Sequence, residues 1–130
     1  QNMGPNIDPE LQIHYNTYLS LCEEYNTEPV HVTTIKFGYL ESESGRVRPV
    51  GKAYWSRHQI IIDREQWDEL NGHFQEEYII LHELGHLAGM RHGDNFIMAG
   101  ENQYNYVYYE SVRWNVLKEY FTQHNQGSIR

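Results

Sequence analysis

The segment over residues 74–88 constrains this chain most, because it is rich in apolar residues and contains no proline and a single glycine, Gly85. This composition predicts a buried helix, and Gly89 directly after it supplies a left-handed C-terminal stop. His82 and His86 lie four positions apart within the segment. Residues four apart share one face of a helix and are separated by about 6 Å along its axis. The sequence therefore predicts a helix with two imidazoles on one face.

The residues around this pair are typical of a catalytic zinc site. Two imidazoles so placed can hold one tetrahedral zinc ion, each at about 2.0–2.1 Å. The turn at Gly89 would bring His92 back to the same ion as a third ligand. Glu83 lies beside the first histidine, where it can reach a metal-bound water as a general base. Three protein ligands leave the fourth position to water, which is the catalytic arrangement.

The pattern His82-Glu83-x-x-His86-x-x-Gly89-x-x-His92 resembles the extended zinc signature of the metzincin clan of metallopeptidases. The specific match covers residues 79–99. The resemblance implies a zinc endopeptidase with one catalytic Zn²⁺ ion. His82, His86 and His92 would hold that ion, and Glu83 would be the general base.

Further residues extend the resemblance beyond the histidines. In the clan a methionine follows in a tight turn beneath the metal, and Met98 is similar in position. Asp94 fits positions where many members carry an acid. The tyrosine that some subfamilies carry two residues after the methionine is absent. Tyr104 and Tyr106 are near enough to replace it, although packing under the C-terminal helix is the favoured explanation for both.

The resemblance also implies the architecture of a small zincin. Its features are a small mixed sheet, a central metal-binding helix and a C-terminal helix, in the layout of small secreted bacterial members. One metallopeptidase domain would span residues 1–130, with an active-site cleft between an upper subdomain (1–89) and a minimal lower one (90–130). The residue patterns independently favour an α+β fold, because strands gather in the first half and helices in the second.

Local patterns predict where the other elements lie. Residues 1–7 are expected to fray, and Asp63 with Gln66 predicts a capping box for a short helix. Glu76 and Glu77 are expected to form a solvated helix start. The remaining expected elements are a helix over 9–25, strands over 30–37, 52–56 and 59–62, a polar solvated loop over 41–49, a loop over 91–105 and a helix over 108–124.

Substrate is expected to bind extended, by main-chain pairing with an edge strand. The strand from Gln59 to Ile62 is the candidate, because the resemblance places the strand before the metal helix above the cleft. Its continuous isoleucine run is also compatible with a fully paired central strand. The other five of the eight histidines show no ligand spacing with the motif and are expected to be surface or structural residues.

Composition excludes several other classes of protein. A length of 130 residues suits a single domain, and no apolar run approaches the ~20 residues that span a bilayer. The net charge of -8 argues against nucleic-acid binding. The single cysteine, Cys22, excludes an internal disulfide framework. We expect a monomer that is secreted or periplasmic, with a mature chain from which a leader has been removed.

Three functions remain open from the sequence. The first is an active zinc endopeptidase. The second is a zinc hydrolase of another amide, such as a cell-wall peptide. The third is a peptide-binding module that keeps the metal without catalysis, which the intact Glu83 disfavours because a pure binding site has no use for a general base.

Overall fold

The computed structural model describes residues 4–43, 45, 47–100 and 105–129. Within these residues the fold is α+β, as predicted, with four α-helices and a four-stranded sheet. In chain order the elements are β1 (Asn6–Ile7), α1 (Gln12–Glu24), β2 (Thr34–Gly38), β3 (Gly51–Tyr54), the 3₁₀ turn η1 (Trp55–Arg57), β4 (Gln59–Asp63), α2 (Arg64–Asp68), α3 (His73–Leu87) and α4 (Tyr106–Ile129).

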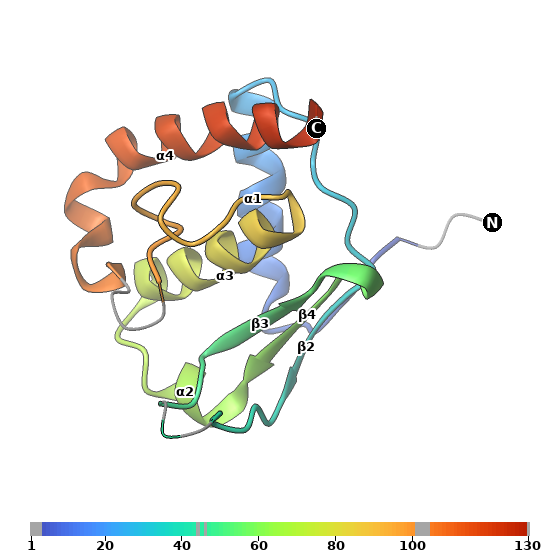
Figure 1. Ribbon diagram of the computed structural model, residues 1–130, viewed down its shortest axis with the longest axis vertical. Helices are drawn as coiled ribbons and strands as arrows, with labels where there is room; N and C mark the ends of the chain where they lie inside the picture. The colour runs from blue at the N-terminus through green and yellow to red at the C-terminus, as the bar shows by residue number, and fades with distance from the viewer. Residues whose placement is uncertain (1–3, 44, 46, 101–104, 130) are drawn as a thin grey trace.

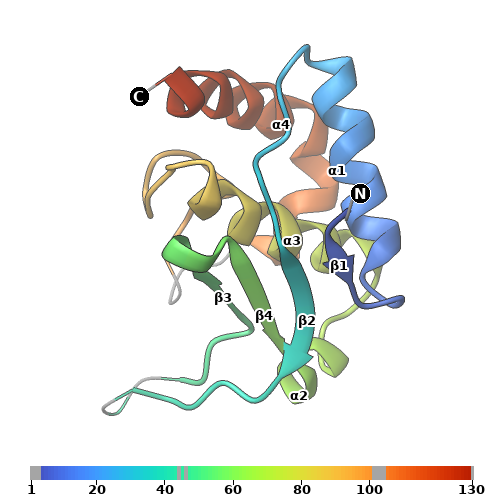
Figure 2. The same ribbon diagram turned by 90° about the vertical axis from the view of Figure 1, so that its right-hand side faces the viewer.

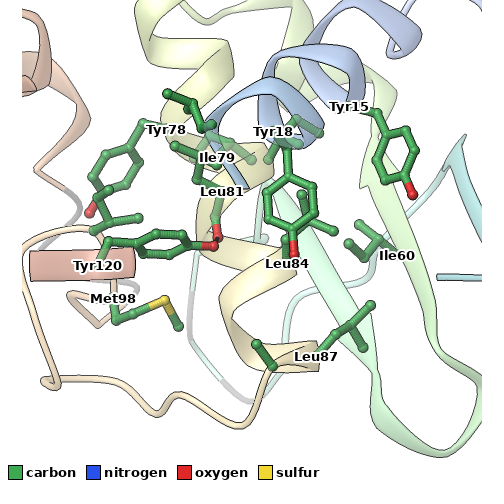
Figure 3. Close-up of a cluster of buried hydrophobic side chains, with 14 of the residues drawn as sticks. Tyr15, Tyr18, Ile60, Tyr78, Ile79, Leu81, Leu84, Leu87, Met98 and Tyr120 are labelled. Carbon is green, nitrogen blue, oxygen red and sulfur yellow. Dashed lines mark hydrogen bonds between the residues drawn. The ribbon is translucent and has the colours of Figure 1, made fainter. Parts of the chain in front are cut away.

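Helix α3 occupies the centre of the molecule, as predicted. It lies between the sheet and α4, and α1 packs against it from behind (Figure 1; Figure 2). From Glu77 to Leu87 every residue except His86 is buried. A helix that is covered on all sides is held by its neighbours rather than by its own propensity. Figure 3 shows α1, α3 and β4 contributing side chains to the same core, with Met98 and Tyr120 beside them.

The sheet has the strand order β1-β2-β4-β3. Strands β1, β2 and β4 are parallel, and β3 pairs antiparallel with β4. Ile60 is paired with Ile35 of β2 on one side and with Ala53 of β3 on the other. The prediction that the strand from Gln59 to Ile62 is an edge is therefore wrong, and its isoleucine run reflects a central strand. The free edge next to α3 belongs to β3.

Two predictions for the first part of the chain were also wrong. Residues 6–7 do not fray, because they form β1 and pair with β2. Helix α1 begins three residues later than position 9, because Asp8 closes a separate turn: its Oδ1 accepts the N–H of Glu10 and its carbonyl accepts the N–H of Leu11. By contrast, the cap predicted for α2 is confirmed, since the Asp63 side chain accepts the N–H of Gln66.

Helices α3 and α4 are joined by a buried ion pair. Arg113 Nε donates to Glu77 Oε2 at 2.7 Å and Arg113 Nη2 donates to Glu77 Oε1 at 3.1 Å, and the Tyr109 hydroxyl donates to the same carboxylate. Glu77 is thus buried, contrary to the expected solvated helix start, because a two-pronged guanidinium and a phenol satisfy its oxygens. None of the helices in the described part of the chain combines the length and apolar character needed to cross a bilayer.

Candidate metal centre

Three histidine side chains converge at the C-terminal end of α3. His82 and His86 lie on α3 and His92 lies in the loop after it, and one ligand atom from each lies within 4.8 Å of the others. The Nε2 atoms of His82 and His86 are 3.2 Å apart. Nitrogens bound to one tetrahedral zinc ion are separated by about 3.3 Å. The predicted convergence is confirmed, and the pair has the spacing that such an ion requires.

The rings of both helical histidines are oriented by backbone carbonyls. His82 Nδ1 lies 2.7 Å from the carbonyl oxygen of Ile97, and His86 Nδ1 lies 3.1 Å from that of Met90. A carbonyl can only accept, so Nδ1 carries the proton in each ring. Each Nε2 is therefore unprotonated, and these are the two atoms that lie 3.2 Å apart at the triad. Such partners fix the tautomer and the direction of a metal ligand, and here both come from the loop after α3.

Burial keeps His82 uncharged. The side chain is 1% exposed, and loss of solvent lowers its pKa to about 3. The neighbouring His86 and His92 lower the pKa of His82 further, against the opposing effect of the bond to Ile97. A neutral imidazole is the form that binds a metal ion.

Gly89 ends α3 and turns the chain toward His92. Its φ is 90°, which confirms the left-handed conformation predicted from the sequence. The N–H of Gly89 donates to His86 O at 3.0 Å, and the N–H of Met90 donates to Gly85 O at 2.9 Å. This double pattern is a Schellman motif, which satisfies the last carbonyls of the helix. The motif also places the Met90 carbonyl where His86 Nδ1 reaches it.

A tight turn presents His92. Asp94 Oδ2 accepts the N–H of Arg91 at 2.8 Å, and the N–H of Asp94 donates to Arg91 O at 3.1 Å. Gly93, with φ of 92°, donates its N–H to Met98 O at 2.8 Å. The carboxylate of Asp94 therefore closes the turn around His92, a role that fits its position just after the third histidine.

Met98 packs directly against α3 and explains a glycine that the sequence analysis passed over. A Cβ at Gly85 would lie 2.5 Å from Met98 Sδ, closer than real contacts allow. Met98 is fully buried beside Tyr120 and α3 (Figure 3). Gly85 lies between the two helical histidines in sequence, so its missing side chain lets the methionine approach the ligand-bearing turn. An isolated glycine inside a helical pattern was the available signal.

Glu83 lies in the wall of a cavity of about 320 Å³ that the three histidines also line. It is 2% exposed, and a Cβ at Gly51 would lie only 3.0 Å from its Cγ. Gly51 of β3 is thus a second residue that the sequence analysis missed, because its contact partner lies 32 positions away. The other walls come from β3, the exposed Trp55 and the loop after α3. The cavity therefore combines a histidine triad that could hold a metal ion with a buried carboxylate.

The remaining candidates lie elsewhere. Tyr106 packs beside Tyr78, with ring centroids 6.2 Å apart, in agreement with the packing alternative. Tyr104 lies outside the described residues. The side chains of His14 and His124 are buried and bonded to Glu76 and Tyr18, respectively, which are structural positions. In the part of the chain that is described, His82, His86 and His92 form the one cluster suited to a metal ion.

Comparison with known proteins adds no information about the site. No family model, no curated protein and no solved structure matches this chain.

Proposed function

We propose that the protein is a zinc-dependent endopeptidase of the metzincin type. The observation that carries this proposal is the convergence of three imidazoles on a cavity that also receives the carboxylate of Glu83. A triad of histidines with room for a further ligand is typical of catalytic zinc sites. The loop that encloses the triad and the packing of Met98 on α3 agree with the same class of enzyme.

The donor set fits zinc and supports a hydrolytic mechanism. When bound, zinc would polarise the scissile carbonyl and lower the pKa of a coordinated water. His82 and His86 hold their Nε2 atoms ready because Ile97 O and Met90 O fix their Nδ1 protons. Glu83 accepts a proton from the attacking water and delivers it to the leaving amine. The buried position of Glu83 limits competing bulk water around this carboxylate.

Strand β3 is the surface on which we place the substrate. It is the antiparallel edge strand, and Gly51, Lys52 and Ala53 line the metal cavity. A peptide that adds to this edge by main-chain hydrogen bonds would pass directly over the triad. Such pairing is independent of side chains, which suits an enzyme acting on extended segments of secreted or periplasmic proteins.

The test is metal analysis paired with digestion of a peptide library, on the wild type and on Glu83→Ala. We expect about one zinc ion per chain in both proteins. The variant should lose hydrolysis by about 10²–10⁴-fold, the usual contribution of a general base. Glu69→Ala changes an exposed glutamate of the α2 end and serves as the matched control, with both zinc and activity retained.

Two outcomes would contradict the proposal. Cleavage by Glu83→Ala at the wild-type rate would remove Glu83 from the mechanism. Stoichiometric zinc without cleavage of any peptide would leave an amide hydrolase of another substrate, or a binding module.

A further inference from the structure

A second cavity, of about 540 Å³, lies beside the metal cavity, and the two share Gly51 and Lys52 in their walls. It is an open cavity between β3 and described residues of the segment that joins β2 to β3. This size lies in the range of about 300–1,000 Å³ that is typical of ligand pockets. Its described lining combines apolar and aromatic groups with three charged side chains: Tyr39, Leu40, Glu41, Ser42, Glu43, Val47, Pro49, Gly51, Lys52 and Tyr54.

The two cavities meet at β3. Gly51 faces Glu83 of α3, and alternate residues of a strand point to opposite faces. Lys52 and Tyr54 therefore point away from α3. Both line the second cavity, and Lys52 also lines the metal cavity. A peptide paired with the free edge of β3 would send successive side chains to alternate faces. A residue close to one that faces the metal cavity would then reach the second cavity, because Gly51 and Lys52 line both.

The charges of this cavity favour a cationic side chain. Glu41 and Glu43 contribute two carboxylates, while Lys52 contributes one ammonium group, 3.9 Å from Glu43 Oε1. Within the described residues Glu41 has no ion-pair partner. The exposed ring of Tyr39 already receives a cation, with the Arg48 guanidinium 4.1 Å from its centroid. The described lining thus has an excess of negative charge beside its apolar and aromatic side chains.

We propose that this cavity is a substrate subsite for an arginine or lysine side chain close to the cleaved bond. The inference rests on the proposed peptidase function. The aliphatic stem of the substrate side chain packs along the apolar and aromatic residues of the lining. Its cationic head reaches Glu41 and Glu43. Glu41 and Glu43, expected from the sequence to belong to a solvated loop, then determine specificity.

A peptide library that varies one position at a time tests the subsite. The quantity measured is the ratio of kcat/KM for arginine to that for norleucine at each position. One position near the cleaved bond should prefer arginine, and the double variant Glu41→Gln/Glu43→Gln should reduce that ratio by about fivefold, as expected for exposed charges. Lys52→Gln should raise the ratio. The matched control Glu23→Gln/Glu24→Gln removes two exposed carboxylates from α1 and should leave it unchanged.

A binding measurement separates this inference from the peptidase proposal. Fluorescence anisotropy of labelled arginine and norleucine peptides on Glu83→Gln reports the subsite whether or not the wild type cleaves. The subsite is supported if the arginine peptide binds more tightly than the norleucine peptide and if Glu41→Gln/Glu43→Gln abolishes this difference. Equal binding of the two peptides overturns it. So does an equal change of their affinity ratio in Glu41→Gln/Glu43→Gln and in the control Glu23→Gln/Glu24→Gln.

A second inference comes from a different part of the molecule, where α4 holds the loop that follows α3. Gln123 Oε1 accepts a hydrogen bond from Asn95 Nδ2 at 2.6 Å, and Gln123 Nε2 donates to Asp94 O at 3.0 Å. Asn95 Oδ1 in turn accepts the N–H of Met98 at 3.1 Å. One carboxamide from α4 therefore fixes the middle of this loop.

The same loop carries everything that completes the triad. It supplies His92 and the carbonyls of Met90 and Ile97 that orient His86 and His82. We infer that Gln123 is a positioning residue for the metal centre, acting through Asn95. Only a group that both donates and accepts satisfies the two partners, which explains why an amide occupies this position.

Zinc affinity, measured by competition with a chromophoric chelator, tests this role without reference to activity. Gln123→Glu keeps the shape but loses the donor, and we expect zinc affinity to fall about 10–100-fold, as for other outer partners of metal ligands. The spectrum of the Co²⁺-loaded variant should change, while urea unfolding of the metal-free protein should change little. Thr122→Ala, on the exposed face of α4, is the control.

Rescue distinguishes positioning from general stability. In the double variant Asn95→Asp/Gln123→Lys, the lysine ammonium group would donate to Asp94 O and to the carboxylate introduced at position 95. This variant should recover most of the zinc affinity. Loss of metal-free stability in Gln123→Glu with unchanged zinc affinity would show a purely structural role.

Discussion

The two halves of the candidate metal centre are built in different ways. His82 and His86 belong to a helix that is packed on all sides, and His82 is 1% exposed. His92 is exposed and belongs to a loop without regular secondary structure. The helix fixes the spacing of its two ligands through backbone geometry alone, whereas the loop is shaped by hydrogen bonds to Asp94, Asn95 and Gln123.

The halves nevertheless depend on each other. The carbonyls that orient the helical rings, Met90 O and Ile97 O, come from the loop. The loop in turn is anchored on α3 through the contact between Met98 and Gly85. The helix therefore sets where His82 and His86 lie, and the loop sets which way their rings point.

Removing one histidine from each half should show the difference between helix and loop most clearly. We expect either His82→Ala or His92→Ala to weaken zinc binding by about 1,000-fold, roughly one third of a typical binding free energy for three ligands. Only His82→Ala should also destabilise the metal-free protein, because it leaves a buried void and the Ile97 carbonyl unpaired. Isothermal titration and urea unfolding measure the two effects. Equal loss of metal-free stability in both variants would contradict the contrast.

Acidification should destabilise the protein through the buried His124. Burial lowers the pKa of His124 to about 4, below 6.5 in the unfolded chain. Between these values the unfolded chain binds more protons, so stability that is complete above pH 6.5 is lost as the pH falls toward 4. The shift corresponds to about 3 kcal/mol. Urea unfolding of the metal-free protein as a function of pH measures this loss.

A variant isolates the contribution of His124. His124→Gln keeps an acceptor for the Tyr18 hydroxyl, which lies 2.7 Å from His124 Nε2, but has no titrating group. Its stability should fall less steeply between pH 6.5 and 4. An unchanged slope would assign the acid sensitivity to other groups.

The anchor between the halves should respond to a single methyl group. Gly85→Ala would place Cβ 2.5 Å from Met98 Sδ, so we expect a loss of about 2 kcal/mol in unfolding free energy in spite of the better helix propensity of alanine. Met98→Ala removes the clashing atom, so the double variant should be more stable than the sum of the single effects predicts. Additive effects in urea unfolding would show that the two residues are not coupled.

The sequence predicted the features that depend on neighbouring residues and missed those that depend on residues far apart in the chain. The helix, its left-handed end at Gly89 and the convergence of His92 depend on residues within about one turn of each other, so their spacing was sufficient. Whether β3 or β4 forms the edge of the sheet depends on which of them pairs with β2, and no local pattern specifies this pairing. Likewise Gly51 and Gly85 are explained by Glu83 and Met98, which the fold brings to them.

The smallest expected effect concerns the turn that presents His92. Asp94 Oδ2 accepts the N–H of Arg91 at the entrance of this turn. Asp94→Ala removes that bond, which costs the ordered conformation of the loop about 1 kcal/mol. Because the loss falls on the loop and not on α3, we expect about a fivefold loss of zinc affinity. Metal-free stability should change by less than about 0.5 kcal/mol. Asp94→Asn keeps an acceptor oxygen and should retain most of the zinc affinity. A large loss of stability in Asp94→Ala would mean that the loop is part of the folding core, and the contrast between a helix that places the ligands and a loop that aims them would fail.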